Sequence, residues 1–124
     1  MSAASRTVLV VEDDPRVRSL LRFVVNRGGF GLIEASDGES ALRVVEEQRP
    51  DLVLLDMHLP GVDGVEVCRR IKSGPETRDV RVLIVTAGTM DEDRNRGLAA
   101  GADGWVNKPF SPLALLERIQ EELS

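Results

Sequence analysis

Short apolar runs alternate along the chain with stretches in which apolar residues recur at helical spacing. Five short runs contain β-branched residues and are candidate strands. They span Val8–Val11, Leu32–Ala35, Leu52–Leu55, Val82–Val85 and Gly104–Val106. The first, third and fourth are continuously apolar, as expected for parallel strands that are covered on both faces. The pattern therefore predicts a parallel sheet with a buried centre.

Between these runs, apolar residues recur every three or four positions, which indicates amphipathic helices. In the first such stretch Asp14 and Pro15 supply an N-cap followed by proline, and Gly28-Gly29 ends the helix. The other helices are expected from Ser36/Asp37 to before Pro50, from about Gly64 to before Gly74, over Asp91–Ala100, and from Ser111-Pro112 onward. Five alternations of strand and helix predict an α/β domain with right-handed crossovers and helices on both faces of the sheet.

Length and charge narrow the class of protein. With 124 residues, of which 42% are hydrophobic, the chain can bury one core without disulfides or a structural metal. Its formal net charge of -5 argues against direct nucleic-acid binding, which requires clustered Lys and Arg. We expect residues 1–6 to form a flexible tail and residues 7–124 to form the domain.

The cysteine content and the lack of long apolar stretches suit a reducing, aqueous compartment. Cys68 is the only cysteine, so no intramolecular disulfide can form and cysteine-based zinc ligation has nothing to build on. No stretch is long and apolar enough to span a bilayer, and residues 1–6 lack the apolar core of a signal peptide. We therefore expect a cytoplasmic protein without a membrane partner.

Chemically reactive side chains follow the predicted strands. Glu12 and Asp13 follow the first run, Asp56 ends the third, and Thr86 and Lys108 follow the fourth and fifth. Ligands of parallel α/β sheets sit beyond the carboxyl ends of the strands, so these side chains are expected around one mouth. A carboxylate at the end of a buried strand needs a cationic partner, or else it takes up a proton. The set predicts a metal-assisted phosphoryl site.

Phosphoryl transfer to a carboxylate is the chemistry that this set suits. A carboxylate can attack an activated phosphoryl group and form an acyl phosphate, if charge is neutralised and the groups are in line. Mg²⁺ prefers oxygen ligands and keeps several waters, so we predict that Asp13 and Asp56 bind it directly and that Glu12 acts through water. Lys108 is predicted to balance one phosphoryl oxygen, and Thr86 to donate its hydroxyl to another.

Four segments together resemble the receiver domain of two-component response regulators. They are Val10–Pro15, Asp51–Gly64, Val85–Ala87 and Gly101–Phe110, in this order and at these spacings. The resemblance implies a flavodoxin-like fold of the chemotaxis-regulator type, with strand order 2-1-3-4-5. It also implies a phosphoacceptor that receives its phosphoryl group from a sensor histidine kinase or phosphotransfer protein in a Mg²⁺-dependent reaction. By position, Asp56 matches the phosphorylated aspartate, Glu12 and Asp13 the acidic pair, Thr86 the switch hydroxyl and Lys108 the invariant lysine.

The resemblance carries further expectations for single positions. It implies the backbone carbonyl of His58 as another Mg²⁺ ligand, and Asn107-Lys108-Pro109 resembles the family's turn with a cis bond before proline. Trp105 stands where the family usually has Tyr or Phe, the aromatic that swings inward when the hydroxyl residue moves. Because an indole is bulkier and carries an N–H, we expect this swing or the output face to be altered. Gly88 is expected to leave one rim of the site open to water.

Two other classes of function stay open at this point. A haloacid-dehalogenase-type phosphatase also uses a strand-end aspartate with Mg²⁺, but it needs a second aspartate where this chain has His58. A receiver-like interaction module that is not phosphorylated would normally have lost part of the acidic pair, the acceptor or the lysine, and all of these are present. We expect no conventional enzyme, but Mg²⁺-dependent self-phosphorylation from a donor, followed by autodephosphorylation.

The output of the domain cannot be read from these residues. The cognate kinase and the downstream effector stay open, as does the choice between a free-standing receiver and part of a longer chain. A homodimer through the fourth helix, fifth strand and fifth helix also stays open.

Overall fold

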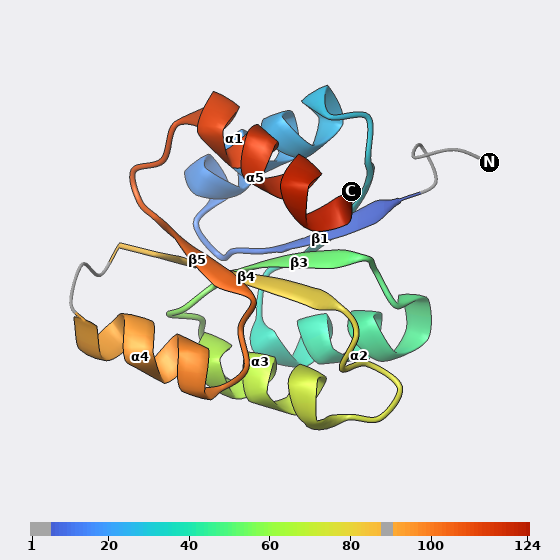
Figure 1. Ribbon diagram of the computed structural model, residues 1–124, viewed down its shortest axis with the longest axis vertical. Coiled ribbons are helices and arrows are strands. Elements are labelled where there is room, and N and C mark those ends of the chain that lie inside the picture. The colour runs from blue at the N-terminus through green and yellow to red at the C-terminus, as the bar shows by residue number, and fades with distance from the viewer. Residues whose placement is uncertain (1–5, 88–90) are drawn as a thin grey trace.

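The computed structural model describes residues 6–87 and 91–124, in which five strands alternate with five helices (Figure 1). The strands are β1 (Thr7–Val11), β2 (Gly31–Ala35), β3 (Leu52–Asp56), β4 (Arg81–Thr86) and β5 (Gly104–Asn107). The helices are α1 (Pro15–Arg27), α2 (Gly38–Gln48), α3 (Gly64–Ser73), α4 (Asp91–Ala99) and α5 (Pro112–Leu123). The predicted elements are confirmed in type and order.

All five strands are parallel, and they pair in the order β2-β1-β3-β4-β5. Helices α1 and α5 cover one face of this sheet, and α2, α3 and α4 cover the other (Figure 1). The expected flavodoxin-like α/β fold is confirmed. The connection after β1 leads to β2 on one side, and the connection after β3 leads to β4 on the other. A crevice therefore opens at the carboxyl ends of β1 and β3, which is where such sheets bind ligands.

Residues of β1 and β3 alternate between two apolar cores. Even-numbered residues of both strands pack with α1 and α5, and odd-numbered residues pack with α2 and α3. Successive side chains of a strand point to opposite faces, so a strand that is covered twice must be apolar at every position. This arrangement explains the continuous apolar runs of the sequence.

Cys68 belongs to the core rather than to a reactive site. It lies on the buried face of α3, and its Sγ is 3.7 Å from the carbonyl oxygen of Ala100. Burial raises the pKa of the Cys68 thiol to about 11, so the thiol stays protonated at neutral pH. A protonated, buried thiol is a poor nucleophile and a poor metal ligand.

Side-chain caps begin four of the helices. Asp14, Asp37, Asp63 and Ser111 each accept a hydrogen bond from a backbone N–H in the first turn of α1, α2, α3 and α5 respectively. From Asp93 onward α4 buries only Gly97, and its Leu98 is 46% exposed. Among the residues whose burial is described, the helix with the weakest apolar pattern in the sequence therefore has the smallest buried face.

The beginning of the domain is tied to the sheet edge. Arg6 accepts a hydrogen bond through its backbone carbonyl from the N–H of Gly31, at 2.8 Å. The rest of the expected tail and Gly88 lie outside the described residues, so those two expectations stay untested. Among the helices of residues 6–87 and 91–124, none has the length and apolar character needed to cross a membrane.

The end of α2 holds a strained residue. Arg49 caps the helix with φ 46° and ψ 67°, and it is the one non-glycine residue with positive φ within the described ranges. An L side chain costs roughly 1–2 kcal/mol in this left-handed conformation, whereas glycine adopts it freely. The Arg49 side chain makes an exposed ion pair with Glu76 at 2.6 Å, an interaction that contributes less than about 1 kcal/mol.

We predict that Arg49→Gly is more stable to unfolding than Arg49→Ala by about 1 kcal/mol. Both variants lose the ion pair with Glu76, but only the alanine variant keeps the strain of the left-handed backbone. Glycine also has more conformational freedom in the unfolded chain, which removes part of the stability that it gains by relieving the strain. Urea unfolding followed by circular dichroism measures the difference. Equal midpoints would show that the backbone at this position relaxes without cost.

Candidate functional site

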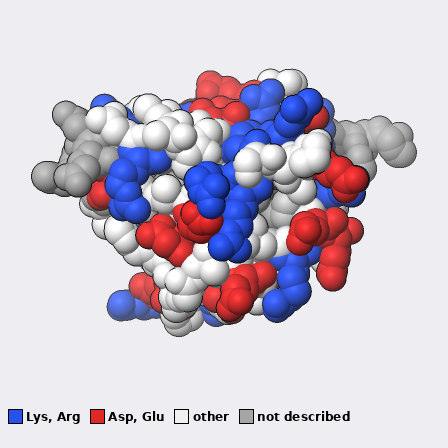
Figure 2. Space-filling view, turned by 90° about the horizontal axis from the view of Figure 1, so that it is seen from below, with Lys and Arg blue, Asp and Glu red and all other residues white. Residues whose placement is uncertain are grey.

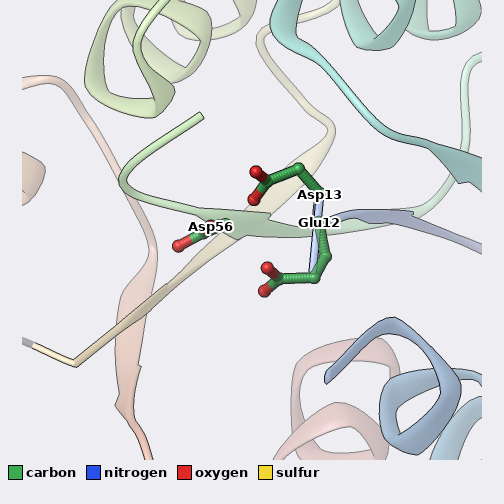
Figure 3. A group of neighbouring side chains, drawn as sticks. All are labelled: Glu12, Asp13 and Asp56. Atoms are coloured by element: carbon green, nitrogen blue, oxygen red, sulfur yellow. The ribbon is translucent and has the colours of Figure 1, made fainter. Parts of the chain in front are cut away.

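Three carboxylates meet where β1 and β3 end (Figure 3). Val11 pairs with Leu55 in the sheet, so the residues that follow, Glu12 and Asp56, come to lie side by side. Together with Asp13, each offers one oxygen, and these oxygens lie within 4.8 Å of one another. In Figure 3 the carboxylates of Glu12 and Asp13 extend to the side on which Asp56 lies. Such a group of hard oxygen donors suits a small divalent cation such as Mg²⁺.

Glu12 is the most deeply buried of the three. Its side chain is only 1% exposed, and Oε2 accepts a hydrogen bond from the backbone N–H of Asp14 at 3.2 Å. No hydrogen bond within the described part of the chain reaches Oε1, although Lys108 forms an ion pair with it. Burial raises the pKa of Glu12, the Lys108 ammonium lowers it, and the Asp56 charge raises it further. The Lys108 ammonium, 3.0 Å from Oε1, is therefore the charge partner that this buried carboxylate needs.

Lys108 supplies the positive charge of the site. Its Nζ lies 3.0 Å from Glu12 Oε1 and 3.5 Å from Asp56 Oδ1. Burial pulls the pKa of Lys108 down, but the two carboxylates outweigh that effect, and the pKa is raised overall. The backbone N–H of Lys108 donates to the carbonyl of Thr86 at 2.8 Å, and the bond to Pro109 is cis. The lysine is therefore held in the mouth by its backbone as well as by its charge.

Asp56 is buried, and the loop after it folds back against it. Its Oδ1 accepts a hydrogen bond from the backbone N–H of His58 at 3.4 Å, whereas the His58 residue as a whole is exposed. The return of the loop requires Gly64, because a Cβ there would lie 2.1 Å from the carbonyl oxygen of Asp56. The structure thus places the backbone of His58 against the Asp56 carboxylate. The exposed His58 residue is not enclosed by the site.

Thr86 and Trp105 lie on one side of the carboxylate group. Thr86 ends β4 and is buried, and both residues line a cavity of about 10 Å³ together with Met57 and Ile84. Trp105 is half-buried, and the guanidinium carbon of Arg94 lies 4.2 Å from the centre of its ring. The predicted switch pair is therefore adjacent, with little free space between the two side chains.

Two arginines contribute to the site although the sequence did not single them out. Arg18, one helical turn after Asp14 on α1, donates from Nη1 to the carbonyl of Glu12 at 3.0 Å and so fixes the backbone of the acidic pair. Its place in the first turns of the helix that follows β1 is the one signal that could have found it. Arg94 covers Trp105 from α4, and nothing in the weak pattern of that helix indicates this contact.

The arrangement suits nucleophilic attack by a carboxylate on a phosphoryl group. Lys108 and the backbone N–H of His58 both contact one oxygen of Asp56, Oδ1, and a carboxylate held in this way can attack phosphorus through its other oxygen. Asp13 is exposed, so the mouth is open to solvent and to a phosphodonor on that side. The donor set is made only of oxygens, which matches the preference of Mg²⁺ and not that of softer metals.

Comparison with known proteins gives a consistent result. The chain matches the response regulator receiver domain over residues 8–120. It is 44% identical to the phosphate regulon transcriptional regulatory protein PhoB of Escherichia coli, over 94% of this chain and 51% of that protein. It is 41% identical to the DNA-binding response regulator MtrA of Mycolicibacterium smegmatis, over 99% of this chain and 53% of that protein. The chain thus spans about half the length of the curated relatives it matches.

Solved structures share the fold over almost the whole chain. A putative response regulator from Chloroflexus aurantiacus aligns with a TM-score of 0.92 and 34% identity, over 96% of this chain and 98% of that one. The receiver domain of the sensor histidine kinase PA1611 from Pseudomonas aeruginosa aligns with a TM-score of 0.89 and 30% identity, over 96% and 98%. The latter structure has a magnesium ion coordinated in its active site cleft.

Proposed function

Because this chain belongs to the receiver domain family of two-component response regulators, we propose that Asp56 is the residue on which it accepts a phosphoryl group. The observation that carries the proposal is the convergence of Glu12, Asp13 and Asp56 beside the ammonium of Lys108. Family membership argues against the dehalogenase-type alternative, and the presence of the complete acidic set argues against a module that is not phosphorylated.

In the proposed reaction, Asp56 Oδ2 attacks the phosphorus atom and forms a new P–O bond while the bond to the donor breaks. The leaving group of the donor takes the electron pair of the broken bond. Lys108 then stabilises a phosphoryl oxygen, which it can reach because its Nζ already lies 3.5 Å from the acceptor carboxylate. Thr86 donates its hydroxyl to another phosphoryl oxygen.

A divalent cation completes the charge balance of this site. Asp13 and Asp56 would hold Mg²⁺ directly, Glu12 through water, and the backbone carbonyl of His58 would be a further ligand. When bound, Mg²⁺ neutralises the charge that gathers on the phosphoryl oxygens during transfer. The convergence of one carboxylate oxygen each from Glu12, Asp13 and Asp56, within 4.8 Å of one another, supports this assignment.

The phosphodonor is a sensor histidine kinase or a phosphotransfer protein, since family members receive their phosphoryl group from such partners. We also propose that phosphorylation changes the interaction of this domain with an effector domain or protein. The relatives PhoB and MtrA are named as a transcriptional regulatory protein and a DNA-binding response regulator. The expected cytoplasmic location belongs to the same proposal.

We predict that Asp56→Asn abolishes labelling by acetyl phosphate with Mg²⁺, because the amide is not a nucleophile toward phosphorus. Intact-mass spectrometry would show one added phosphoryl group on the parent protein and none on the variant. Asp79→Asn is a matched control, because Asp79 is exposed and lies in the loop between α3 and β4, at the other end of the sheet. Equal labelling of Asp56→Asn would move the acceptor to another residue.

We also predict that Mg²⁺ stabilises the fold, because it binds the native carboxylate group and not the unfolded chain. At ten times the Kd the gain is about 1.4 kcal/mol, which a thermal melt detects as a rise in Tm. Asp13→Asn should lose most of this gain and Asp79→Asn should keep it. A melt of the parent protein that is indifferent to millimolar Mg²⁺ would contradict the ligand set.

The switch assignment predicts a change in Trp105 fluorescence. If a phosphoryl group draws Thr86 toward Asp56, the cavity between Thr86 and Trp105 enlarges and the ring can turn inward. Beryllofluoride with Mg²⁺, which mimics the phosphoryl group, should blue-shift the emission and reduce quenching by acrylamide. The effect should vanish in Asp56→Asn and weaken in Thr86→Ala. An unchanged spectrum at saturating beryllofluoride would remove Trp105 from the switch.

A further inference from the structure

A groove between α2 and α3 takes no part in the proposed phosphoryl chemistry. It has a volume of about 640 Å³, which lies in the range of pockets that bind small molecules. Residues of α2 from Glu39 to Arg49 line one side, and the end of α3 and the loop up to Thr77 line the other. This hollow, called the α2–α3 groove below, is separate from the carboxylates that meet where β1 and β3 end.

The α2–α3 groove joins an apolar floor to planar cations. Val45 and Ile71 are buried and Leu42 is half-buried, so the inner part of the lining is apolar. Because this floor is already largely covered, a purely apolar ligand would gain little by covering it further. The outer lining includes three exposed arginines, which are Arg43, Arg49 and Arg70. The arginines therefore dominate what the groove can recognise.

Two of these guanidiniums are positioned by the protein and keep donors for a ligand. Arg43 Nη2 donates to Ser40 Oγ at 3.3 Å, and Arg70 Nε donates to Glu66 Oε2 at 2.8 Å. A guanidinium carries five N–H donors, and within the described ranges each of these two uses a single nitrogen on the protein. Their other N–H groups can bind a phosphate, whose geometry matches the planar fork of arginine.

The third arginine, Arg49, is kept at a cost to the fold. Its backbone is left-handed, with φ 46°, where glycine would be free of strain. Its one ion pair, with Glu76, is exposed and returns less free energy than the strain costs. Strained backbone persists at functional sites because the residue there serves another purpose. The guanidinium that Arg49 brings to the groove is such a purpose.

Carboxylates on the same helix limit the kind of anion that fits. Glu39 and Glu46 of α2 also line the groove, are exposed, and form no ion pair with any residue in the described ranges. Figure 2 looks onto the layer of α2, α3 and α4, where basic and acidic side chains interleave. A bare anion would meet carboxylates as well as guanidiniums. The groove therefore suits a ligand that joins an anionic group to N–H or O–H donors.

We propose that the α2–α3 groove binds a nucleotide. Its phosphate accepts hydrogen bonds from the arginines, its flat base covers the apolar floor, and its amino and hydroxyl groups donate to Glu39 and Glu46. A free nucleotide is favoured over a nucleic-acid strand, because the net charge of -5 and the interleaved carboxylates oppose a long phosphate backbone. The inference goes beyond the proposed function and does not depend on phosphorylation of Asp56.

Isothermal titration calorimetry with AMP, GMP, CMP and UMP tests the site. The buffer contains no Mg²⁺, since that ion would also draw a nucleotide to the carboxylates at the end of β3. At least one of these mononucleotides should bind with a Kd below about 1 mM. Inorganic phosphate and the matching nucleoside, which each lack half of the ligand, should bind at least about tenfold more weakly. A single-stranded oligonucleotide should bind no more tightly than the mononucleotide.

Variants of Arg49 separate binding from stability. Arg49→Gly and Arg49→Ala should weaken binding equally, by at least about tenfold, although the two differ in resistance to urea. Arg70→Gln should weaken binding to a similar extent. Arg27→Gln is the matched control, because Arg27 is an exposed arginine of α1, on the other face of the sheet, and it should leave binding unchanged. In NMR spectra of the parent chain, the nucleotide should shift the amide signals of Ile71 and Thr77.

Several results would overturn the nucleotide site. These are no binding of any mononucleotide up to ~10 mM, equal binding of inorganic phosphate, and tighter binding of the oligonucleotide. Binding that survives both Arg49→Gly and Arg70→Gln, or that fails in Arg27→Gln, would place the ligand elsewhere. Labelling of Asp56 by acetyl phosphate should be the same in all these variants, so failure of the nucleotide site and failure of the proposed function can be told apart.

Discussion

The ammonium of Lys108 between the buried carboxylates of Glu12 and Asp56 is the interaction on which the site depends. Without it, two strand ends would bring like charges together inside the protein. At 3.0 Å the attraction between Lys108 and Glu12 is on the order of 5 kcal/mol for an effective dielectric of about 20, and much of this offsets the desolvation of both groups. The lysine thus offsets the repulsion between the two carboxylates, which would otherwise oppose folding. The same positive charge is available to a phosphoryl group.

Apolar side chains fill the two layers on either side of the sheet that carries this cluster. Both cores are apolar, and Cys68 contributes only a protonated thiol to one of them. The mouth is then shaped by backbone contacts: Arg18 holds the carbonyl of Glu12, and Gly64 lets the loop after β3 approach Asp56. Rigid strands therefore set the positions of the carboxylates, and short loops close the site around them.

The two sides of the molecule differ in how they can respond to a change at the mouth. On the side of β4, Trp105 is held between a small cavity toward Thr86 and the guanidinium of Arg94. Helix α4 buries little, so a shift of this helix costs few apolar contacts. On the other side, α1 and α5 are anchored in a core through Leu21 and Leu115 and leave an apolar face outward. One side is suited to movement, and the other is held in place by its core.

Much of this protein could be predicted from local sequence patterns. The continuous apolar run before Asp56 indicates a doubly covered strand, and Asp14-Pro15 indicates a helix start, because both signals arise within a few neighbouring residues. The rule that ligands sit at the carboxyl ends of parallel strands then brought Glu12, Asp56 and Lys108 to one mouth. The strand order itself came from the resemblance to receiver domains, since periodicity does not encode which strands pair.

Only the tertiary structure decided the contacts that join distant elements. The stacking of Arg94 on Trp105, the bond from Arg18 to Glu12 and the left-handed backbone of Arg49 leave no mark in the local pattern. Phe23 fits the apolar stripe of its helix as well as Val24 does, yet Val24 is buried and Phe23 is exposed. Helical spacing shows which residues share a stripe, but packing between helices sets its edge, because burial depends on neighbours far away in the chain.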